Sequence, residues 1–403
     1  MSFLPLRGVR IVDFCANIAG PFGSMILAQL GADVIKVEPP AGDDSRHYAS
    51  QAAGVSVVHR YVGAGKRGVV IDLKSPDGVE VALAIIARSD VVLQSMRPGV
   101  ADRLGIGREA ALAQNPDVLY YDVNAFGTGP VGRGRPGYDP LVQAFSGIME
   151  MTGHDDAPPT RCAPSVVDLG TGQWVAMGVL GALLARAKGQ DVGTLETSLV
   201  DTAFSLVAYQ ATSARVTGQR PRRAGSGNPI AAPYQCYEAA DGYLLLAAPS
   251  QKLWEAAARA LGAPGLIDEE RFATVADRTR NKDALEITIT AITLREPTET
   301  WIERLSAAGV PAGKVFGLEE AVQTDIAAER GTFVDSDDVP LVRLPWLADG
   351  EPLAWQRPAP RLGEHTTEVL AELGYDAERR DELLASGAVA GDPAQSGTAA
   401  TRI

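Results

Sequence analysis

The chain of 403 residues contains few cysteines and few histidines. Its three cysteines, Cys15, Cys162 and Cys236, are scattered and odd in number, which argues against a disulfide framework and predicts reduced thiols. The four histidines form no pair at i, i+4 spacing and none lies beside a cysteine cluster. We therefore predict neither a disulfide-stapled fold nor a zinc site, and no other metal is implied.

Long apolar runs are also missing. The most apolar stretch, Trp174 to Ala185, is shorter than the roughly 20 residues that a membrane-spanning helix needs, and it ends at Arg186. The first residues lack the basic-then-apolar pattern of a secretion signal. From these absences we expect a cytoplasmic protein that does not use a membrane.

The net charge of −13 disfavours nonspecific attraction to nucleic acid or to an anionic membrane. One segment departs from this balance, because positions 60–108 hold eight basic residues against five acidic ones. The basic residues are Arg60, Lys66, Arg67, Lys74, Arg88, Arg97, Arg103 and Arg108. This basic segment is either a solvated surface or a site for a phosphorylated small molecule.

Apolar periodicity predicts alternating strands and helices in the first part of the chain. Strands are expected at 9–14, 33–37, 69–73, 90–94 and 117–123, and helices through Leu30, from Pro76 and over 108–114. Such alternation is typical of a doubly wound, mostly parallel sheet. We therefore predict an α/β protein whose large domain has this sheet.

The composition changes at 217–232, where glycine, proline and arginine mix as in an exposed linker. A hairpin at 234–248 and several helical patterns follow, which predicts a smaller α+β domain. We place the first part of the large α/β domain at 1–216 and the linker with the small domain at 217–330. Residues 331–390 are predicted to return to the large domain, and 391–403 to form a flexible tail.

Two nucleotide-binding signatures are incomplete. The first strand is followed by Gly20-Pro21-Phe22-Gly23, which does not match the G-x-G-x-x-G pattern of dinucleotide-binding proteins. In Gly63-Ala64-Gly65-Lys66 the next residue, Arg67, stands where a P-loop needs serine or threonine for magnesium. A nicotinamide-dependent dehydrogenase and a P-loop nucleotidase are both disfavoured.

Asp168 is the strongest candidate for a reactive group. It lies in Ser165-Val166-Val167-Asp168-Leu169-Gly170, where we expect a strand-like step to meet a long apolar helix. Backbone amides at a helix start stabilise a carboxylate, and the small residues nearby leave room for a substrate carbonyl. The alternative is a simple N-cap, which contributes about 1 kcal/mol to helix stability and has no chemical role.

A set of short motifs, in order from Leu6 to about Gly387, resembles the class III coenzyme A transferase family, also called the carnitine dehydratase and bile-acid-inducible protein F family. The motifs include Gly8-Val9-Arg10-Ile11-Val12-Asp13, Ala19-Gly20-Pro21, Leu30-Gly31-Ala32-Asp33-Val34-Ile35-Lys36-Val37-Glu38, Arg97-Pro98-Gly99, Gly137-Tyr138-Asp139 and Ile230-Ala231-Ala232-Pro233-Tyr234. Each motif is weak alone, but their order and spacing together indicate the family.

By this resemblance, Asp168 is the catalytic aspartate. Its carboxylate would attack an acyl-CoA to form a mixed anhydride, and CoA would then form an aspartyl-CoA thioester that an acceptor acid attacks. CoA is a substrate in this chemistry, and no resident cofactor is implied. The resemblance also implies a homodimer in which each chain is threaded through its partner.

The resemblance assigns further residues to the CoA site. They are Asn17, Ile18 and Ala19 near the thioester, Ile71 and Met96 along the adenine and pantetheine path, Lys74, Arg97 and Arg103 near the phosphates, and Tyr138. Two positions depart from the family pattern, since Ile18 replaces a polar side chain and Pro39 replaces a basic one. The glycine-rich loop with which some transferases shield the intermediate is also absent around Pro249-Ser250-Gln251.

Three other functions stay open. An α-methylacyl-CoA racemase of the same family needs a histidine base where this chain has Tyr138, and a phenol with a pKa near about 10 is a poor base at neutral pH. An acyl-CoA hydrolase would release CoA without an acceptor. A noncatalytic CoA-binding protein would bind CoA without turnover.

Overall fold

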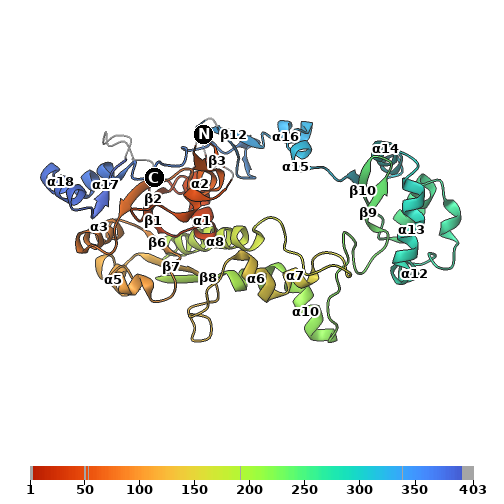
Figure 1. Cartoon of the computed structure of the whole chain (residues 1–403), viewed down its shortest axis with the longest axis horizontal. Helices are drawn as coiled ribbons and strands as arrows, with labels where there is room; N and C mark the ends of the chain where they lie inside the picture. Colours follow the sequence, from red (N-terminus) through yellow and green to blue (C-terminus); the bar gives the residue numbers. More distant parts are fainter. Residues whose placement is uncertain (1–2, 50, 53, 191, 338, 393–403) are drawn as a thin grey trace. The chain divides into compact units, whose positions relative to one another are not determined.

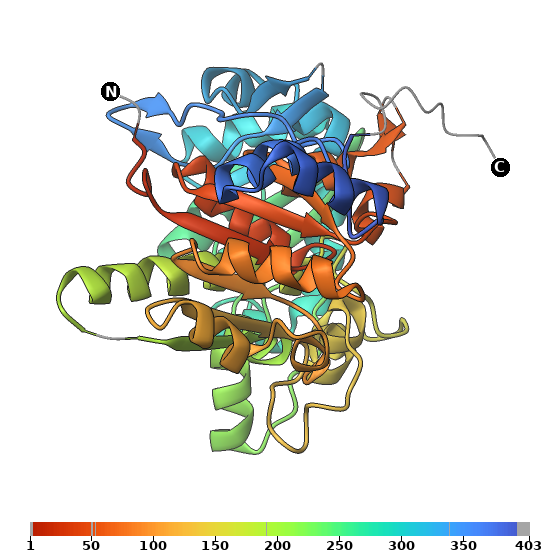
Figure 2. The same cartoon turned by 90° about the vertical axis from the view of Figure 1, so that its left-hand side faces the viewer.

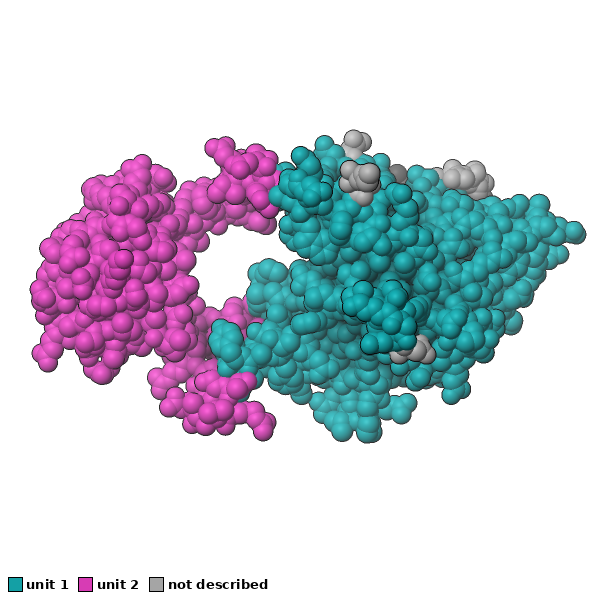
Figure 3. All heavy atoms as spheres, turned by 180° about the vertical axis from the view of Figure 1, so that it is seen from behind, with its two compact units in different colours: residues 1–146, 162–211, 331–403 teal, residues 147–161, 212–330 magenta. Residues whose placement is uncertain are grey.

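The computed structural model describes residues 3–49, 51–52, 54–190, 192–337 and 339–392. The contacts divide the chain into two compact units, coloured separately in Figure 3. Unit 1 comprises Met1–Ser146, Cys162–Ala211 and Gly331–Ile403, and unit 2 comprises Gly147–Arg161 and Thr212–Arg330. Each unit is described by itself below.

Unit 1 is built on a seven-stranded sheet with the order β16-β5-β2-β1-β6-β7-β8. Its strands are β1 (Arg10–Phe14), β2 (Asp33–Glu38), β5 (Arg67–Ile71), β6 (Val91–Gln94), β7 (Leu119–Asn124), β8 (Thr194–Ser198) and β16 (Val389–Ala390). Every neighbouring pair is parallel except β16 with β5, in which Val389 pairs with Ile71. The predicted doubly wound, mostly parallel sheet is therefore confirmed.

Successive strand residues face opposite layers of helices, as the pleat of a strand requires. Ile11 and Val34 lie in a core with α1 (Ala19–Gln29), α2 (Val57–Gly63) and α8 (Val166–Ala187). Val12 and Ile35 lie in a second core on the other face. Its helices are α3 (Pro76–Ile86), α5 (Arg108–Gln114), α17 (Thr366–Leu373) and α18 (Ala377–Ala385), and Figure 2 shows this layer in front of the sheet.

Shorter elements complete unit 1 (Figure 1). The helices are η1 (Asp44–His47), α4 (Val100–Arg103), α6 (Asp139–Ser146) and α9 (Leu199–Leu206). The strands are β3 (Gln51–Ala52), β4 (Val55–Ser56), β12 (Phe333–Ser336), β13 (Val339–Val342), β14 (Leu347–Ala348) and β15 (Glu351–Pro352). Strand β8, α6 and α9 have no counterpart among the elements predicted from the sequence.

Unit 2 has its own core around Trp254, Phe272, Ile289 and Trp301, below an antiparallel sheet of β9 (Tyr234–Ala239), β10 (Gly242–Ala247) and β11 (Ala312–Lys314). Its helices are α7 (Ile148–Met151), α11 (Gln251–Ala260), η2 (Pro264–Ile267), α12 (Val275–Arg280), α13 (Lys282–Thr293), α14 (Thr298–Ala307), α15 (Leu318–Ala321) and α16 (Asp325–Glu329). Helix α10 (Ala208–Thr217) runs across the boundary.

The observed units differ from the expected domain bounds at 147–161 and at 212–216, which the sequence analysis placed in the large domain and which belong to unit 2. The contacts of 147–161 involve Arg223. Its guanidinium donates hydrogen bonds to the carbonyl oxygens of Glu150 and Ala157 and forms an ion pair with the Glu150 carboxylate. These contacts attach 147–161 to the segment after α10. Of the tail expected at 391–403, residues 393–403 lie outside the described residues.

Helix α8 is long and apolar enough, by length and composition, to cross a membrane. The helix contains Asp168 and Arg186, so it is not a charge-free apolar run of the kind that the sequence analysis found missing. Its 22 residues include small polar positions before Trp174, which the sequence analysis did not count. Val175 and Val179 are fully buried against unit 1, which is the behaviour of a core helix.

Candidate active site

Asp168 lies in the first turn of α8, as its third residue. The residues before it, Val166 and Val167, are helical and do not form the strand-like step that the sequence predicted. Asp168 is half-buried. None of the hydrogen bonds of the described residues uses its carboxylate as a helix cap, so the alternative reading of Asp168 as a simple N-cap is not supported.

The cap of α8 is Asp139, which the sequence analysis noted only as part of a motif. One carboxylate oxygen of Asp139 accepts the N–H of Val167 at 2.9 Å and that of Asp168 at 3.3 Å. The other accepts the side-chain amide of Gln143 at 2.6 Å. Asp139 is 1% exposed. A buried acid thus satisfies the orphan amides of this helix start and leaves the Asp168 side chain free.

This arrangement changes the acidity of Asp168. Burial, and then the negative charge of Asp139, raise the pKa of Asp168 to about 7. A carboxyl group with such a pKa is ionised in a substantial fraction of molecules at neutral pH and is a stronger nucleophile than an ordinary, more acidic carboxylate.

Helices α1 and α8 approach closely beside Asp168. A Cβ on Gly172, one turn after Asp168, would lie 2.6 Å from the carbonyl oxygen of Ala19. A Cβ on Gly23 would lie 2.7 Å from the carbonyl oxygen of Gly172. Only glycine fits at such a contact. It places Ile18 and Ala19, at the start of α1, next to the first turns of α8.

The loop between β1 and α1 is fixed on both sides. The N–H of Ala16 donates to Oγ of Ser95 at 2.9 Å, and the N–H of Asn17 donates to Asp43 at 3.2 Å. Asn17 has φ +67°, a left-handed conformation that is uncommon outside glycine. Its side-chain oxygen accepts a hydrogen bond from the hydroxyl of Tyr48.

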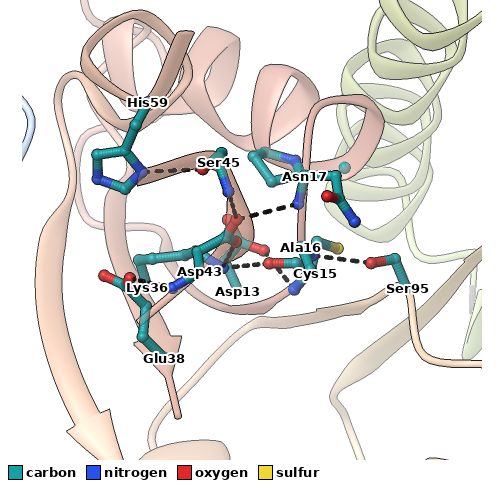
Figure 4. Close-up of polar contacts among 12 residues, drawn as sticks. Asp13, Cys15, Ala16, Asn17, Lys36, Glu38, Asp43, Ser45, His59 and Ser95 are labelled. Atoms are coloured by element: carbon teal, nitrogen blue, oxygen red, sulfur yellow. Dashed lines mark hydrogen bonds and ion pairs between the residues drawn. The ribbon is translucent and has the colours of Figure 1, made fainter. Parts of the chain in front are cut away.

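A buried ionic network lies beneath this loop (Figure 4). Nζ of Lys36 donates to the carbonyl oxygen of Cys15 and pairs with Asp43 at 3.1 Å. Burial opposes both charges, but the attraction of Lys36 and the hydrogen bonds from Ser45 lower the pKa of Asp43 to about 2. Asp43, and then Asp13, raise the pKa of Lys36 above its usual value. Both groups are therefore charged at neutral pH and hold the loop from below.

Tyr48, which holds the Asn17 side chain, lies within electrostatic range of Asp168. Burial raises the pKa of Tyr48, and the negative charges of Asp43, Asp44 and Asp168 raise it further. Charges act in this way over short separations, so Tyr48 and Asp168 occupy one region of unit 1. Tyr138 precedes α6 and is 60% exposed.

The predicted CoA residues follow strands that end at one edge of the sheet. Ile71 ends β5, Lys74 follows it, and Met96 and Arg97 follow β6. In doubly wound sheets ligands bind at this carboxyl edge, where neighbouring strands lead to helices on opposite faces. Here that position is between β1 and β6, and the hydrogen bond from Ala16 to Ser95 crosses it.

The side chain of Ile71 is 1% exposed and packs in the core with Val81 and Val389. The backbone of Ile71, at the end of β5, stays the predicted contact with CoA. Met96 is half-buried, and Lys74, Arg97 and Arg103 are exposed.

The basic segment separates into structural and accessible cations. Lys66 is buried and pairs with Asp13 at 3.0 Å, and Arg67 is buried and pairs with Asp33, Glu368 and Glu372. In contrast, no ion pair is recorded within the described ranges for Lys74, Arg97 and Arg103. These three cations remain available to an anionic ligand.

Two cavities lie outside the residues predicted to form the active site. One of about 700 Å³ lies in unit 2 among Glu150, Arg220 and Arg223, and one of about 370 Å³ in unit 1 is lined by Arg10, Arg67 and other residues. Both contain mainly charged side chains that already pair with one another. Among the residues that the structure describes, no group of three or more His, Cys, Asp or Glu could hold a metal ion.

Sequence reasoning missed four residues that shape the site: Asp139, Tyr48, Asp43 and Lys36. Asp139 before Pro140 and Asp43 after Gly42 carry the local signal of a cap or turn. That signal does not say which distant amide the carboxylate will accept.

Comparisons with known proteins identify the family of the chain. The family model described as CoA-transferase family III matches residues 6–366. An acetyl-CoA:oxalate CoA-transferase of Acetobacter aceti is 34% identical, covering 89% of this chain and 93% of the relative. A succinate–glutarate CoA-transferase of Agrobacterium fabrum is 32% identical, covering 92% and 96%. The crystal structure of a CAIB/BAIF family protein from Brucella suis superposes with a TM-score of 0.83 at 31% identity, covering 92% of this chain and 99% of that one.

The family match covers most of the chain. The relatives above 30% identity match over nearly their whole length, and both are named CoA-transferases. The chain therefore belongs to CoA-transferase family III.

Proposed function

We propose that this enzyme moves CoA from an acyl-CoA to a carboxylic acid through covalent intermediates on Asp168. The observation that carries this proposal is the placement of Asp168. Its carboxylate is uncommitted to any cap, has a pKa near 7 and lies one helical turn before the close contact of Gly172 with Ala19.

The chemistry needs no other protein nucleophile. A carboxylate oxygen of Asp168 forms a bond to the acyl carbon, and the C–S bond breaks with its electron pair on sulfur. The CoA thiolate then attacks the Asp168 carbonyl and releases the acyl group as a carboxylate. The acceptor carboxylate repeats these steps in reverse, so the thioester is conserved.

We infer that at least one of the two acids is a dicarboxylate. The relatives described above are named for oxalate and for the pair succinate and glutarate. A second carboxylate on the substrate would be attracted to a cation near the carboxyl edge of the sheet.

The three accessible cations, Lys74, Arg97 and Arg103, are proposed to bind the phosphates of CoA, while Met96 contacts its pantetheine arm. CoA enters as a substrate, and the chemistry requires no metal or resident cofactor. We further propose that the protein works in the cytoplasm, without nucleic acid or membrane, as an interlocked homodimer.

The test is turnover with acetyl-CoA or succinyl-CoA as donor and oxalate, glutarate, succinate or acetate as acceptor, followed by mass spectrometry of the acyl-CoA products. Trapping with hydroxylamine or borohydride and mapping of the peptides should place the modification on Asp168. Asp168→Asn should lose at least about a thousandfold in turnover, as expected for loss of a covalent nucleophile.

Other outcomes point to other functions. Free CoA that accumulates without an acceptor indicates a hydrolase. Solvent deuterium entering the α-carbon of a 2-methylacyl-CoA indicates a racemase. Transfer at the wild-type rate by Asp168→Asn contradicts the covalent mechanism.

A further inference from the structure

Asn17 has a side chain that the transfer scheme does not yet use. Its backbone N–H is held by Asp43 and its side-chain oxygen by Tyr48. The remaining donor, the Nδ2 amide, has no hydrogen-bond partner among the residues that the structure describes. Because the oxygen accepts a hydrogen bond from a hydroxyl, the amide orientation is fixed and Nδ2 keeps its donors for a ligand.

The left-handed backbone of Asn17 is maintained by its surroundings. A non-glycine residue at φ +67° is strained, and it persists because the buried pair of Asp43 and Lys36 fixes the loop. Figure 4 shows Asn17 at the end of that network, next to Cys15 and Ala16. Strain held in this way at a site is often linked to the positioning of a functional group.

Asn17 lies two residues before a close contact with α8. A Cβ on Gly172, one turn after Asp168, would lie 2.6 Å from the carbonyl oxygen of Ala19. Ile18 and Leu169, the neighbours of Asn17 and Asp168, pack against the same hydrophobic core. These packing contacts place Asn17 in the neighbourhood of the proposed nucleophile.

We propose that Asn17 is a catalytic residue, whose side-chain amide donates a hydrogen bond to the acyl oxygen while Asp168 attacks the thioester. This inference rests on the proposed transfer through Asp168. As the new C–O bond forms, the carbonyl π electrons move to the acyl oxygen and make it an oxyanion. The oxyanion then re-forms the carbonyl, and the C–S electrons leave with the CoA sulfur. No proton is transferred in this step, so a neutral amide donor is sufficient.

The test compares Asn17→Gly and Asn17→Asp with the wild type, using the donor and acceptor that turn over fastest in the panel above. Glycine suits the left-handed backbone and removes only the amide, whereas aspartate keeps the acceptor for Tyr48 and replaces the donor by a negative charge. Measurements at pH 9 keep Asp168 ionised in every variant. We expect kcat to fall about 100- to 1000-fold in Asn17→Gly and further in Asn17→Asp, as for loss of an oxyanion donor.

The matched control is Asp349→Gly, which relieves a similar left-handed residue, φ +54°, at an exposed turn in the same unit. It should keep wild-type kcat. CoA affinity, measured by calorimetry with free CoA, should be unchanged in Asn17→Gly, because the amide acts on the reacting carbonyl. Tyr48→Phe should cause a smaller loss of kcat, since the amide is then free to rotate.

Wild-type kcat in Asn17→Gly, or a loss confined to KM and CoA affinity, would overturn the role of Asn17. Asp168→Asn is assayed alongside to separate the two claims. If Asp168→Asn still transfers CoA, the proposed function itself fails. If Asp168→Asn is inactive but the Asn17 variants remain fully active, Asp168 keeps its role and Asn17 loses the one proposed here.

Discussion

Asp168 is held in surroundings that favour its neutral form, although the proposed chemistry requires the charged form. Asp168 lies in the first turn of α8, and the carboxylate of Asp139, from α6, reaches the same turn and is the one that accepts its backbone amides. The helix therefore stabilises the ion that does not react and leaves the reactive one basic. The acidity of Asp168 sets two measurable properties of the enzyme.

The first is the pH dependence of turnover. Because Asp168 must be ionised to attack, kcat/KM for the acyl-CoA should rise with pH and reach a plateau above a pKa near 7. Asp139→Asn removes one negative charge and keeps an oxygen for the two amides, so the rising limb should move to lower pH. Steady-state kinetics between pH 5 and 9 measure both. A rate that is constant or falls across this range would contradict the assignment.

The second is stability. A carboxyl group whose pKa is raised by folding binds more protons in the native state than in the unfolded chain, where its pKa is about 3.9. Asp168 therefore destabilises the fold increasingly as pH rises from about 4 through 7. Asp168→Asn should raise the melting temperature by a few degrees at pH 8 and by little at pH 4, as followed by calorimetry. Asp156→Asn, at an exposed loop residue, is the control and should change neither.

Helix α8 positions Asp168 through its contact with α1. This contact depends on two glycines, which have no side chain to keep the helices apart. Gly23 and Gly172 bring the two backbones together, while Val175 and Val179 fill the core below. The start of each helix contributes residues to the proposed site, so we expect activity to depend on the distance between α1 and α8.

Gly172→Ala tests whether activity depends on the distance between α1 and α8. Its Cβ would lie 2.6 Å from the carbonyl oxygen of Ala19, and backbone cannot yield as a flexible side chain can. We expect a loss of about 1–3 kcal/mol in the free energy of unfolding and a fall in kcat, because the Asn17–Ala19 loop moves away from Asp168. Urea denaturation and the transfer assay measure the two effects.

Gly265→Ala, in η2 of unit 2, is the control. A Cβ there meets nothing within 4 Å, and the residue is exposed. This variant should gain about 0.4–1 kcal/mol, because alanine has fewer backbone conformations than glycine in the unfolded chain, and should keep its activity. Equal behaviour of the two variants would show that the close contact of α1 and α8 has no role.

The elements also show how far sequence reasoning reaches. Strands β1, β2, β5, β6 and β7 and helices α1, α3 and α5 were predictable, because buried parallel strands and amphipathic helices leave strong local patterns. The short elements between them, such as α2 and α4, were not predicted. The short β16 was not, because its pairing with β5 joins residues more than 300 positions apart. Asp168 was found through the family motifs, whereas its cap by Asp139 depends on packing between α6 and α8. Likewise, Lys66 and Arg67 looked accessible until the fold supplied their partners.

At the scale of the whole molecule, α8 has a second apolar stripe that unit 1 does not cover. Trp174, Met177 and Leu184 are 45%, 49% and 57% exposed, and their spacing places them on one face of the helix, around Gly181. The opposite face, with Val175 and Val179, is buried. Apolar residues in a continuous exposed stripe are typical of a protein interface.

The stripe agrees with the proposed homodimer, whose interlocking makes a specific prediction. If each chain is threaded through its partner, the subunits cannot separate without unfolding, so no native monomer should exist at any dilution. Light scattering should give twice the mass of one chain, and loss of helical signal in urea should coincide with loss of the dimer.

Met177→Glu should lower the urea midpoint of both unfolding and dissociation together, because it buries a charge in the interface. Ile287→Glu, at an exposed apolar residue of α13, should leave that midpoint unchanged. A native monomer with full helical signal, in the wild type or in Met177→Glu, would contradict the interlocked arrangement.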